Sequence, residues 1–105
     1  MKRIFAEFCH TSKAVCLKFS YGLFRDGTTA LGIGPGDEVI TSAYTYTASA
    51  SVVCHVGAKL VLVDTAENSH EMDYEKLEAA ITEKTKAVIP VDLAGIVCDY
   101  NRIFE

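Results

Sequence analysis

Residues 31–64, LGIGPGDEVITSAYTYTASASVVCHVGAKLVLVD, are the stretch of this chain that decides its fold. Gly34-Pro35-Gly36-Asp37 is a strong turn signal, and the apolar run Glu38–Thr41 behind it predicts a short strand. Ala48–Val56 is rich in alanine, serine and valine, which suits a helix packed closely on a sheet, and Lys59–Val63 is a second apolar run. Continuous apolar strands are typical of a parallel sheet covered on both faces.

The rest of the chain continues this alternation. Gly57 is expected to end the helix at its C′ position. Asp73 can cap a helix that runs to about Ile81, with an inward face formed by Tyr74, Leu77, Ala80 and Ile81. The other predicted elements are a third apolar strand at Lys86–Val91, a helix at Asp99–Glu105, a helix at Lys2–Cys9 and a strand at Ala14–Leu17. Strands and helices in succession imply βαβ crossovers and an α/β fold with a mainly parallel sheet.

Length and composition exclude several classes of function. A chain of 105 residues, half of them hydrophobic, fits one domain with a real core. Its formal net charge is −4 and it has no run of lysine or arginine, so we expect neither a nucleic-acid nor a membrane partner. No apolar stretch approaches the roughly 20 residues that a bilayer requires. The basic start is interrupted by Glu7 and His10, unlike a signal peptide, and the expected location is cytoplasmic.

Two further patterns resemble functional motifs but are better explained as structure. Gly32-Ile33-Gly34-Pro35-Gly36 lacks the spacing of a dinucleotide loop and precedes a strand rather than a helix, so we interpret it as a turn. The cysteines show no paired CxxC spacing, and adjacent Cys-His residues on a helix point about 100° apart. No metal site is therefore expected, and the thiols are expected to be reduced core residues at Cys9, Cys16, Cys54 and Cys98.

Four segments in order, LGIGPGDEVIT, YTYTASASVV, VGAKLVLVD and DYEKLEAAITEKTKAVIPVDLAG, resemble the DegT/DnrJ/StrS family of pyridoxal-phosphate sugar aminotransferases. The likeness runs from about Phe5 to the end of the chain, apart from one segment. It implies an incomplete large domain over residues 1–105: a partial three-layer α/β/α fold of the fold-type-I transferases. The first and last helices look abrupt, which is the expectation for a piece of something larger.

The resemblance also implies an activity for the complete relative. It would move an amino group from glutamate to a keto-sugar nucleotide with pyridoxal 5'-phosphate as cofactor, working as a homodimer with sites near the subunit boundary. Some members dehydrate instead, and the residues leave both reactions open. Such chemistry serves nucleotide-sugar biosynthesis and cell-surface polysaccharide.

Candidate site residues follow the predicted strands, where open parallel sheets present their ligand-contacting loops. In the family, an aromatic residue at the position of Tyr46 lies against the pyridine ring, while the alternative is that Tyr44 and Tyr46 simply pack at the surface. By the same resemblance Asp92 is a candidate contact to cofactor or substrate, although it could equally cap local backbone. Asp64 is expected to be satisfied by nearby loop amides.

Residues 18–29, KFSYGLFRDGTT, depart from the family. Relatives have a loop such as Asn-Ser-Ala-Thr-Ala here, which cradles the cofactor phosphate at a helix N-terminus. Ser20 and Tyr21 are the candidate phosphate contacts, yet Tyr21 replaces a threonine and its ring would obstruct the anion. Asp26 and Gly27 also weaken the following helix.

We hypothesise that this segment is frameshifted. With suitable codons, its DNA read one base later encodes Asn-Ser-Ala-Thr-Ala-Cys-Phe-Glu-Met-Ala-Leu-Arg, a family-like loop and helix. Two compensating insertions or deletions would then bound the segment. Sequencing the coding DNA tests this, because other codons at these positions would end the idea.

The Schiff-base lysine of the family is expected outside this chain, so no catalytic residue is assigned. None of Lys59, Lys76, Lys84 and Lys86 has the required context, and the chemistry needs an amine to hold the cofactor. For the chain alone we favour an inactive product of a truncated or decayed gene, with no cofactor bound. A small α/β binding module is the remaining alternative.

Overall fold

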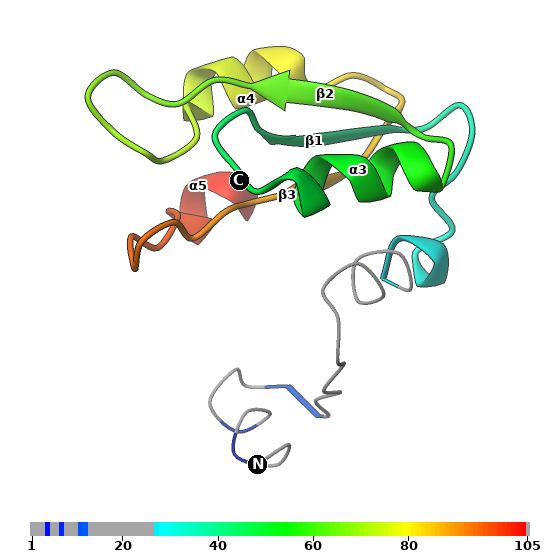
Figure 1. Cartoon of the computed structure of the whole chain (residues 1–105), viewed down its shortest axis with the longest axis horizontal. Coiled ribbons are helices and arrows are strands. Elements are labelled where there is room, and N and C mark those ends of the chain that lie inside the picture. The colour runs from blue at the N-terminus through cyan, green and yellow to red at the C-terminus, as the bar shows by residue number, and fades with distance from the viewer. Residues whose placement is uncertain (1–3, 5–6, 8–10, 13–26, 105) are drawn as a thin grey trace.

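A computed structural model describes residues 4, 7, 11, 12 and 27–104. Figure 1 shows the strand β1 between two others, and all pairings in this three-stranded sheet are parallel, in the order β2-β1-β3. The predicted parallel α/β fold is therefore confirmed. Along the chain the elements are β1 (Glu38–Ser42), α3 (Thr47–His55), β2 (Lys59–Val63), α4 (Tyr74–Ala80), β3 (Thr85–Ile89) and α5 (Tyr100–Phe104).

The central strand β1 is buried along its whole length. Its partner on one side is β2, with Val39 opposite Leu60. On the other side the register with β3 shifts: Glu38 pairs with Thr85, but Val39 pairs with Ala87. The intervening Lys86 is passed over, and its side chain is exposed to solvent. The shift keeps a lysine in the strand without burying its charge.

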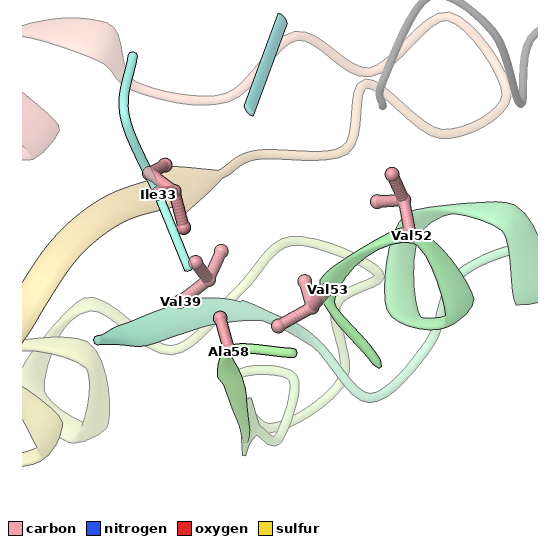
Figure 2. Packing of buried hydrophobic residues seen from close by; sticks show 5 residues of the cluster. All are labelled: Ile33, Val39, Val52, Val53 and Ala58. Carbon is pink, nitrogen blue, oxygen red and sulfur yellow. The ribbon is translucent and has the colours of Figure 1, made fainter. Parts of the chain in front are cut away.

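One face of the sheet is covered by α3. Figure 2 shows the buried side chains that meet there, with Val39 from β1 and Val52 and Val53 from α3. Ala48 and Ser49 are also buried, because such small side chains let the helix approach the sheet closely. The predicted small-residue helix is confirmed.

Gly57 ends α3 in a Schellman motif. Its φ is +79°, the left-handed region that glycine adopts without a Cβ clash. The N–H of Gly57 donates to the carbonyl of Cys54 (3.0 Å), and the N–H of Ala58 donates to that of Val53 (3.1 Å). Val53 and Ala58 also meet in the core, which is the apolar contact that accompanies this motif. The C′ role predicted for Gly57 is confirmed.

The opposite face of the sheet is covered by α4 and α5, with a core of Ile40, Val63, Met72 and Leu77 against which Ile103 packs. Asp73 caps α4 as predicted, accepting the N–H groups of Glu75 (3.1 Å) and Lys76 (3.2 Å). The inward orientation predicted for Ile81 is wrong, since this side chain is 54% exposed. Its backbone is already extended (ψ 130°), so it has left the helical face.

The turn before β1 is a type II turn. Pro35 and Gly36 are its central residues, with Gly36 at φ +97°. The N–H of Asp37 donates to the carbonyl of Gly34 (3.1 Å), and the Asp37 carboxylate accepts the Gly34 N–H (3.0 Å). The structural interpretation of this glycine-rich stretch is confirmed.

Some predicted boundaries differ or lie outside the described residues. Strand β3 begins one residue earlier and ends two residues earlier than predicted, because Pro90 has no N–H to extend the ladder. Residues 27–30 are helical despite Gly27. Most of the helix predicted at Lys2–Cys9, the strand at Ala14–Leu17 and residues 18–26 lie outside the described part. Within the described part, no helix reaches the length and apolarity of a membrane crossing.

Candidate cofactor site at the carboxyl edge of the sheet

Strands β1 and β3 are neighbours, and the chain that follows each of them turns toward a different face of the sheet. From β1 the chain enters α3, which packs on the Val39 face. From β3 it enters α5, whose Ile103 packs on the Ile40 face. Two adjacent parallel strands that diverge in this way form a topological switch point, and the space beyond their carboxyl ends, called the crevice below, is where ligands of open α/β sheets bind. The segments that border this crevice are the loops at residues 43–46 and 90–99.

The loop after β1 presents Tyr46 to solvent. Ser42 Oγ accepts the N–H of Tyr44 (3.2 Å), and Thr45 Oγ1 donates to Ser49 Oγ (2.9 Å), which fixes the loop on the start of α3. Tyr46 stands at the N-cap of α3 without using its side chain as a cap, and it is 74% exposed. Within residues 27–104, no hydrogen bond or ring contact involves the Tyr46 side chain, so its aromatic face is available to a ligand.

Tyr44 has a different environment although it lies two residues away. Its ring lies 5.4 Å from the ring of His70, centroid to centroid, with the planes at 35°. His70 comes from the loop after β2, so the contact joins two loops of the carboxyl edge. The packing alternative therefore describes Tyr44, while Tyr46 keeps an open ring.

Asp92 holds together the loop after β3. Its Oδ1 accepts the N–H of Cys98 (2.9 Å), and its Oδ2 accepts the hydroxyl of Tyr100 (3.1 Å). The hydrogen bond from Cys98 is the main reason that the pKa of Asp92 is lowered. Burial raises the pKa of the Tyr100 hydroxyl, with the Asp92 hydrogen bond acting in the same direction. Both carboxylate oxygens are thus engaged inside the loop, which agrees with the local capping alternative.

Within this loop, residues 93–96 form a tight turn at the surface. The N–H of Ile96 donates to the carbonyl of Leu93 (2.9 Å), and the two central residues have positive φ, 54° at Ala94 and 85° at Gly95. Both φ values match a type I′ turn. A non-glycine residue in this conformation is uncommon and is held here by the closure of the loop around Asp92.

Residues beyond those expected from the sequence also hold this region. The Cys98 thiol is buried and donates to the carbonyl of Val91 (3.3 Å), and burial raises its pKa. Tyr74 of α4 accepts the N–H of Asp99 through its hydroxyl (2.6 Å), while the Arg102 guanidinium lies 4.9 Å from its ring centroid. No sequence motif marks these contacts: Cys98 and Val91 lie in one irregular loop, and Tyr74 is 25 or more residues away from Asp99 and Arg102.

Other candidate residues have structural roles. Asp64 accepts the N–H of Thr65 (2.9 Å), as expected of a carboxylate satisfied by a loop amide. Among the residues the structure describes, no group of acidic, histidine and cysteine side chains could hold a metal ion. Cys54 and Cys98 are free thiols, the first exposed and the second buried, so the core role expected for Cys54 is wrong. Ser20 and Tyr21, like Cys9 and Cys16, lie outside the described residues.

The four described lysines lie outside the loops at residues 43–46 and 90–99. Lys59 begins β2 and its Nζ donates to Glu38 (2.7 Å) at the amino edge of the sheet. Lys84 precedes β3 and Lys86 is its second residue, so both belong to the same amino edge. Lys76 lies in the first turn of α4 and pairs with Asp73 (3.3 Å). All four therefore belong to segments other than the two loops at the carboxyl ends of β1 and β3.

The chain is similar to proteins of one known family. The model of the DegT/DnrJ/EryC1/StrS aminotransferase family matches residues 2–105. GDP-perosamine synthase of Caulobacter vibrioides is 42% identical over 104 residues, which cover 99% of this chain and 28% of that protein. UDP-2-acetamido-2-deoxy-3-oxo-D-glucuronate aminotransferase of Pseudomonas aeruginosa is 53% identical over 74 residues, covering 70% of this chain and 21% of its own length.

Solved structures superpose closely on the chain. The PLP form of Spr1654 from Streptococcus pneumoniae has a TM-score of 0.92 and 53% identity, covering 98% of this chain and 26% of that one. An aminotransferase from Psychrobacter cryohalolentis has a TM-score of 0.91 and 35% identity, with the same coverage of both chains. The chain thus spans about a quarter of the length of the relatives it matches.

Proposed function

The chain belongs to the DegT/DnrJ/EryC1/StrS aminotransferase family, and from this premise we propose that its carboxyl edge forms one wall of a pyridoxal 5'-phosphate site. The observation that carries the proposal is Tyr46, which is 74% exposed and belongs to the loop that follows β1 at the carboxyl edge of the sheet. An aromatic face suits the electron-poor ring of this cofactor. A relative with 53% identity and the same fold is solved in a PLP form, which supports the proposal.

Within that wall the residues take separate roles. Tyr46 contacts the flat face of the cofactor. Asp92 acts as a positioning residue, because it holds residues 92–98 in a closed loop at the other side of the crevice. Ser20 and Tyr21 are the proposed contacts to the phosphate, within an aberrant segment at residues 18–29. We assign the whole chain to the large, cofactor-binding domain of the family.

The reaction of the complete protein is proposed from its relatives. Two of them are named for the synthesis or amination of sugars linked to GDP or UDP. We therefore propose transfer of an amino group from glutamate to a keto-sugar nucleotide, by a cytoplasmic homodimer. The cofactor, when bound, supplies the aldehyde that carries the amino group between the two substrates.

For the 105 residues by themselves we propose no turnover. Lys59, Lys84 and Lys86 lie at the amino edge, and Lys76 is paired with Asp73, so none offers an amine to the crevice. Titration of the purified chain with pyridoxal phosphate, followed by borohydride reduction and peptide mapping, tests this. Saturable binding with the cofactor trapped at one lysine would contradict it.

A chimaera tests the ring-wall proposal directly. This chain would replace the matching quarter of Spr1654, and cofactor affinity would be measured by absorbance titration. Replacing Tyr46→Ala is expected to weaken binding about 2- to 12-fold, the range of an aromatic stacking contact. Tyr46→Phe is expected to retain binding, since it keeps the ring.

Matched variants separate the possible outcomes. Tyr44→Ala removes the neighbouring ring that contacts His70, and it is expected to leave affinity nearly unchanged. A second chimaera keeps the Spr1654 sequence in place of residues 18–29. If only that version binds the cofactor, the aberrant segment is the obstruction. If the binding-competent chimaera holds the cofactor equally well with Tyr46 and with Tyr46→Ala, the proposed role of Tyr46 is refuted.

A further inference from the structure

The loop after β3, residues 90–99, is held at its far end by a side chain of another helix. The N–H of Asp99 donates to the hydroxyl of Tyr74 in α4, with 2.6 Å between the two atoms. Among the described residues, no other hydrogen bond joins residues 93–99 to α4. The bond spans 25 positions of the sequence, so it fixes the end of the loop to a part of the fold that lies outside the loop.

Tyr74 is a firm anchor because its own position is fixed. It is the first residue of α4 and follows the cap Asp73, whose carboxylate accepts two backbone N–H groups of the first turn. The residue before the cap, Met72, is 2% exposed and lies in the core with Ile40, against which the Tyr74 ring also packs. The guanidinium of Arg102 lies 4.9 Å from the centroid of the ring. The ring is therefore held by both the core and α5.

The hydroxyl of Tyr74 acts at the point where the loop ends and α5 begins. It accepts the N–H of Asp99 and donates its own hydrogen to Oε1 of Glu71 at 3.5 Å. Burial raises the pKa of this hydroxyl, so it stays protonated at neutral pH. Asp99 in turn caps α5, because its Oδ1 accepts the N–H groups of Asn101 (3.1 Å) and Arg102 (3.3 Å). One hydroxyl thus holds the residue from which the helix starts.

The two loops that border the crevice are anchored differently. The loop after β1 is fixed by Ser42 and Thr45, which form hydrogen bonds with the loop itself and with the start of α3. In the loop after β3, Asp92 closes residues 92–98 on themselves. That closure sets the shape of the loop but not its place relative to the sheet. The bond to Tyr74 supplies this second constraint.

We propose that Tyr74 is a positioning residue for the cofactor site, acting through Asp99 on the loop that carries Asp92. This role rests on the proposed function, which makes that loop one side of the site. Residues 94–97 are exposed, and exposed loops open at a low cost in free energy. When a loop is in place only part of the time, the apparent affinity falls in proportion to that fraction. Loss of the bond should therefore loosen the loop and weaken cofactor binding.

Amide exchange of the purified chain tests the anchor without any cofactor. Tyr74→Phe keeps the ring and removes the hydroxyl. It is expected to accelerate exchange at Asp99 and residues 93–98 about 2- to 12-fold, the effect of one lost hydrogen bond, and to leave residues 43–46 unchanged. Tyr44→Phe is the matched control, because its hydroxyl makes no hydrogen bond with the described residues, and it should alter neither loop. Circular dichroism should confirm that both variants fold.

The binding-competent chimaera with Spr1654 tests the link to the cofactor. Tyr74→Phe is expected to weaken cofactor affinity about twofold or more, but by no more than the acceleration of exchange at Asp99. Saturating cofactor should slow exchange at residues 93–99, because a ligand stabilises the state that it binds. A merely structural role for Tyr74 would not produce this protection. Tyr44→Phe should leave the affinity unchanged.

The outcomes separate this role from the cofactor site itself. Unchanged exchange at Asp99 and residues 93–98 in Tyr74→Phe would overturn the role, whatever the cofactor does. A loosened loop with full affinity, in a chimaera that Tyr46→Ala weakens, would also overturn it and would leave the proposed site standing. If neither Tyr46→Ala nor Tyr74→Phe changes the affinity, the proposed site and the positioning role are both refuted.

Discussion

The two ends of the same three strands are built differently. At the amino edge, one buried carboxylate, that of Glu38 in β1, accepts Lys59 of β2 and Thr82 from the segment before β3, both at 2.7 Å. At the carboxyl edge, the hydrogen bonds beyond the strand ends mostly close individual loops, such as that of Asp92 with Cys98. A single carboxylate therefore links three segments at the amino edge. At the carboxyl edge the strands are linked separately, by Thr41 Oγ1 to the Ile89 carbonyl (2.9 Å) and by the Ala43 N–H to the Val63 carbonyl (2.8 Å), and Tyr46 beyond them stays exposed.

The largest effect on stability is expected in the buried core that lies between the two edges. Ile40 of β1 is completely buried between Val63, Met72 and Leu77. Ile40→Ala is expected to lower the free energy of unfolding by about 2–5 kcal/mol, because it removes apolar burial and leaves a cavity. Urea denaturation followed by circular dichroism measures this.

The exposed Leu62 of β2 provides the control for Ile40→Ala. Leu62→Ala is expected to change the free energy of unfolding by about 0.5 kcal/mol or less, as for most surface substitutions. Similar losses for the two variants would show that the Ile40 layer is not the core of the chain.

An intermediate effect, and one that depends on pH, is expected at the amino edge. The side chain of Glu38 is only 8% exposed, and the hydrogen bonds from Lys59 and Thr82 lower its pKa below the ordinary value of 4.5. The folded state thus favours the ionised carboxylate. Its contribution to the free energy of unfolding is therefore present above about pH 4.5 and is lost as the pH falls through the folded pKa. Glu38→Gln should lower the urea midpoint at neutral pH.

Lowering the pH distinguishes the contribution of Glu38 to stability from that of other carboxylates. The difference between the wild type and Glu38→Gln should shrink well below the ordinary carboxyl pKa. Glu83→Gln, at an exposed position just before β3, is the control and should behave like the wild type. A constant gap between wild type and Glu38→Gln at every pH would mean that the charge of Glu38 is not the stabilising feature.

The smallest effect on stability is expected at the carboxyl edge. Asp92→Asn removes the acceptor for Tyr100 but keeps an oxygen for the Cys98 N–H, so the loss should be below about 1 kcal/mol. Amide exchange should nevertheless accelerate in residues 93–98, because one of the two hydrogen bonds that hold the loop is lost. Tyr100→Phe deletes the same contact and should add little to Asp92→Asn. If the effects of the two substitutions on amide exchange are fully additive, Asp92 and Tyr100 act independently.

Local signals in the sequence were enough for much of the fold. The type II turn, the Asp73 cap and the Gly57 ending each depend on residues within five positions of one another, so spacing alone predicts them. The central position of β1 and the register shift at Glu38 depend on contacts across 20 to 50 residues, which no local pattern encodes.

The candidate site was predictable only where local signals and the family resemblance reach. The position of Tyr46 follows from the rule that ligands bind at strand ends, combined with the family resemblance. The pairing of Tyr44 with His70 and of Asp92 with Tyr100 was not predicted, because loops without a regular period separate the partners.

The register shift in β3 also bears on how this family can change length. One residue, Lys86, has no partner of its own on β1, so the strand carries a spare position at its start. A deletion there would leave Ala87, Val88 and Ile89 facing their present helices. A deletion after it would reverse the strand and turn Val88 toward α3, because side chains alternate between faces. Insertions and deletions among homologues should therefore concentrate at position 86 and avoid the three residues that follow.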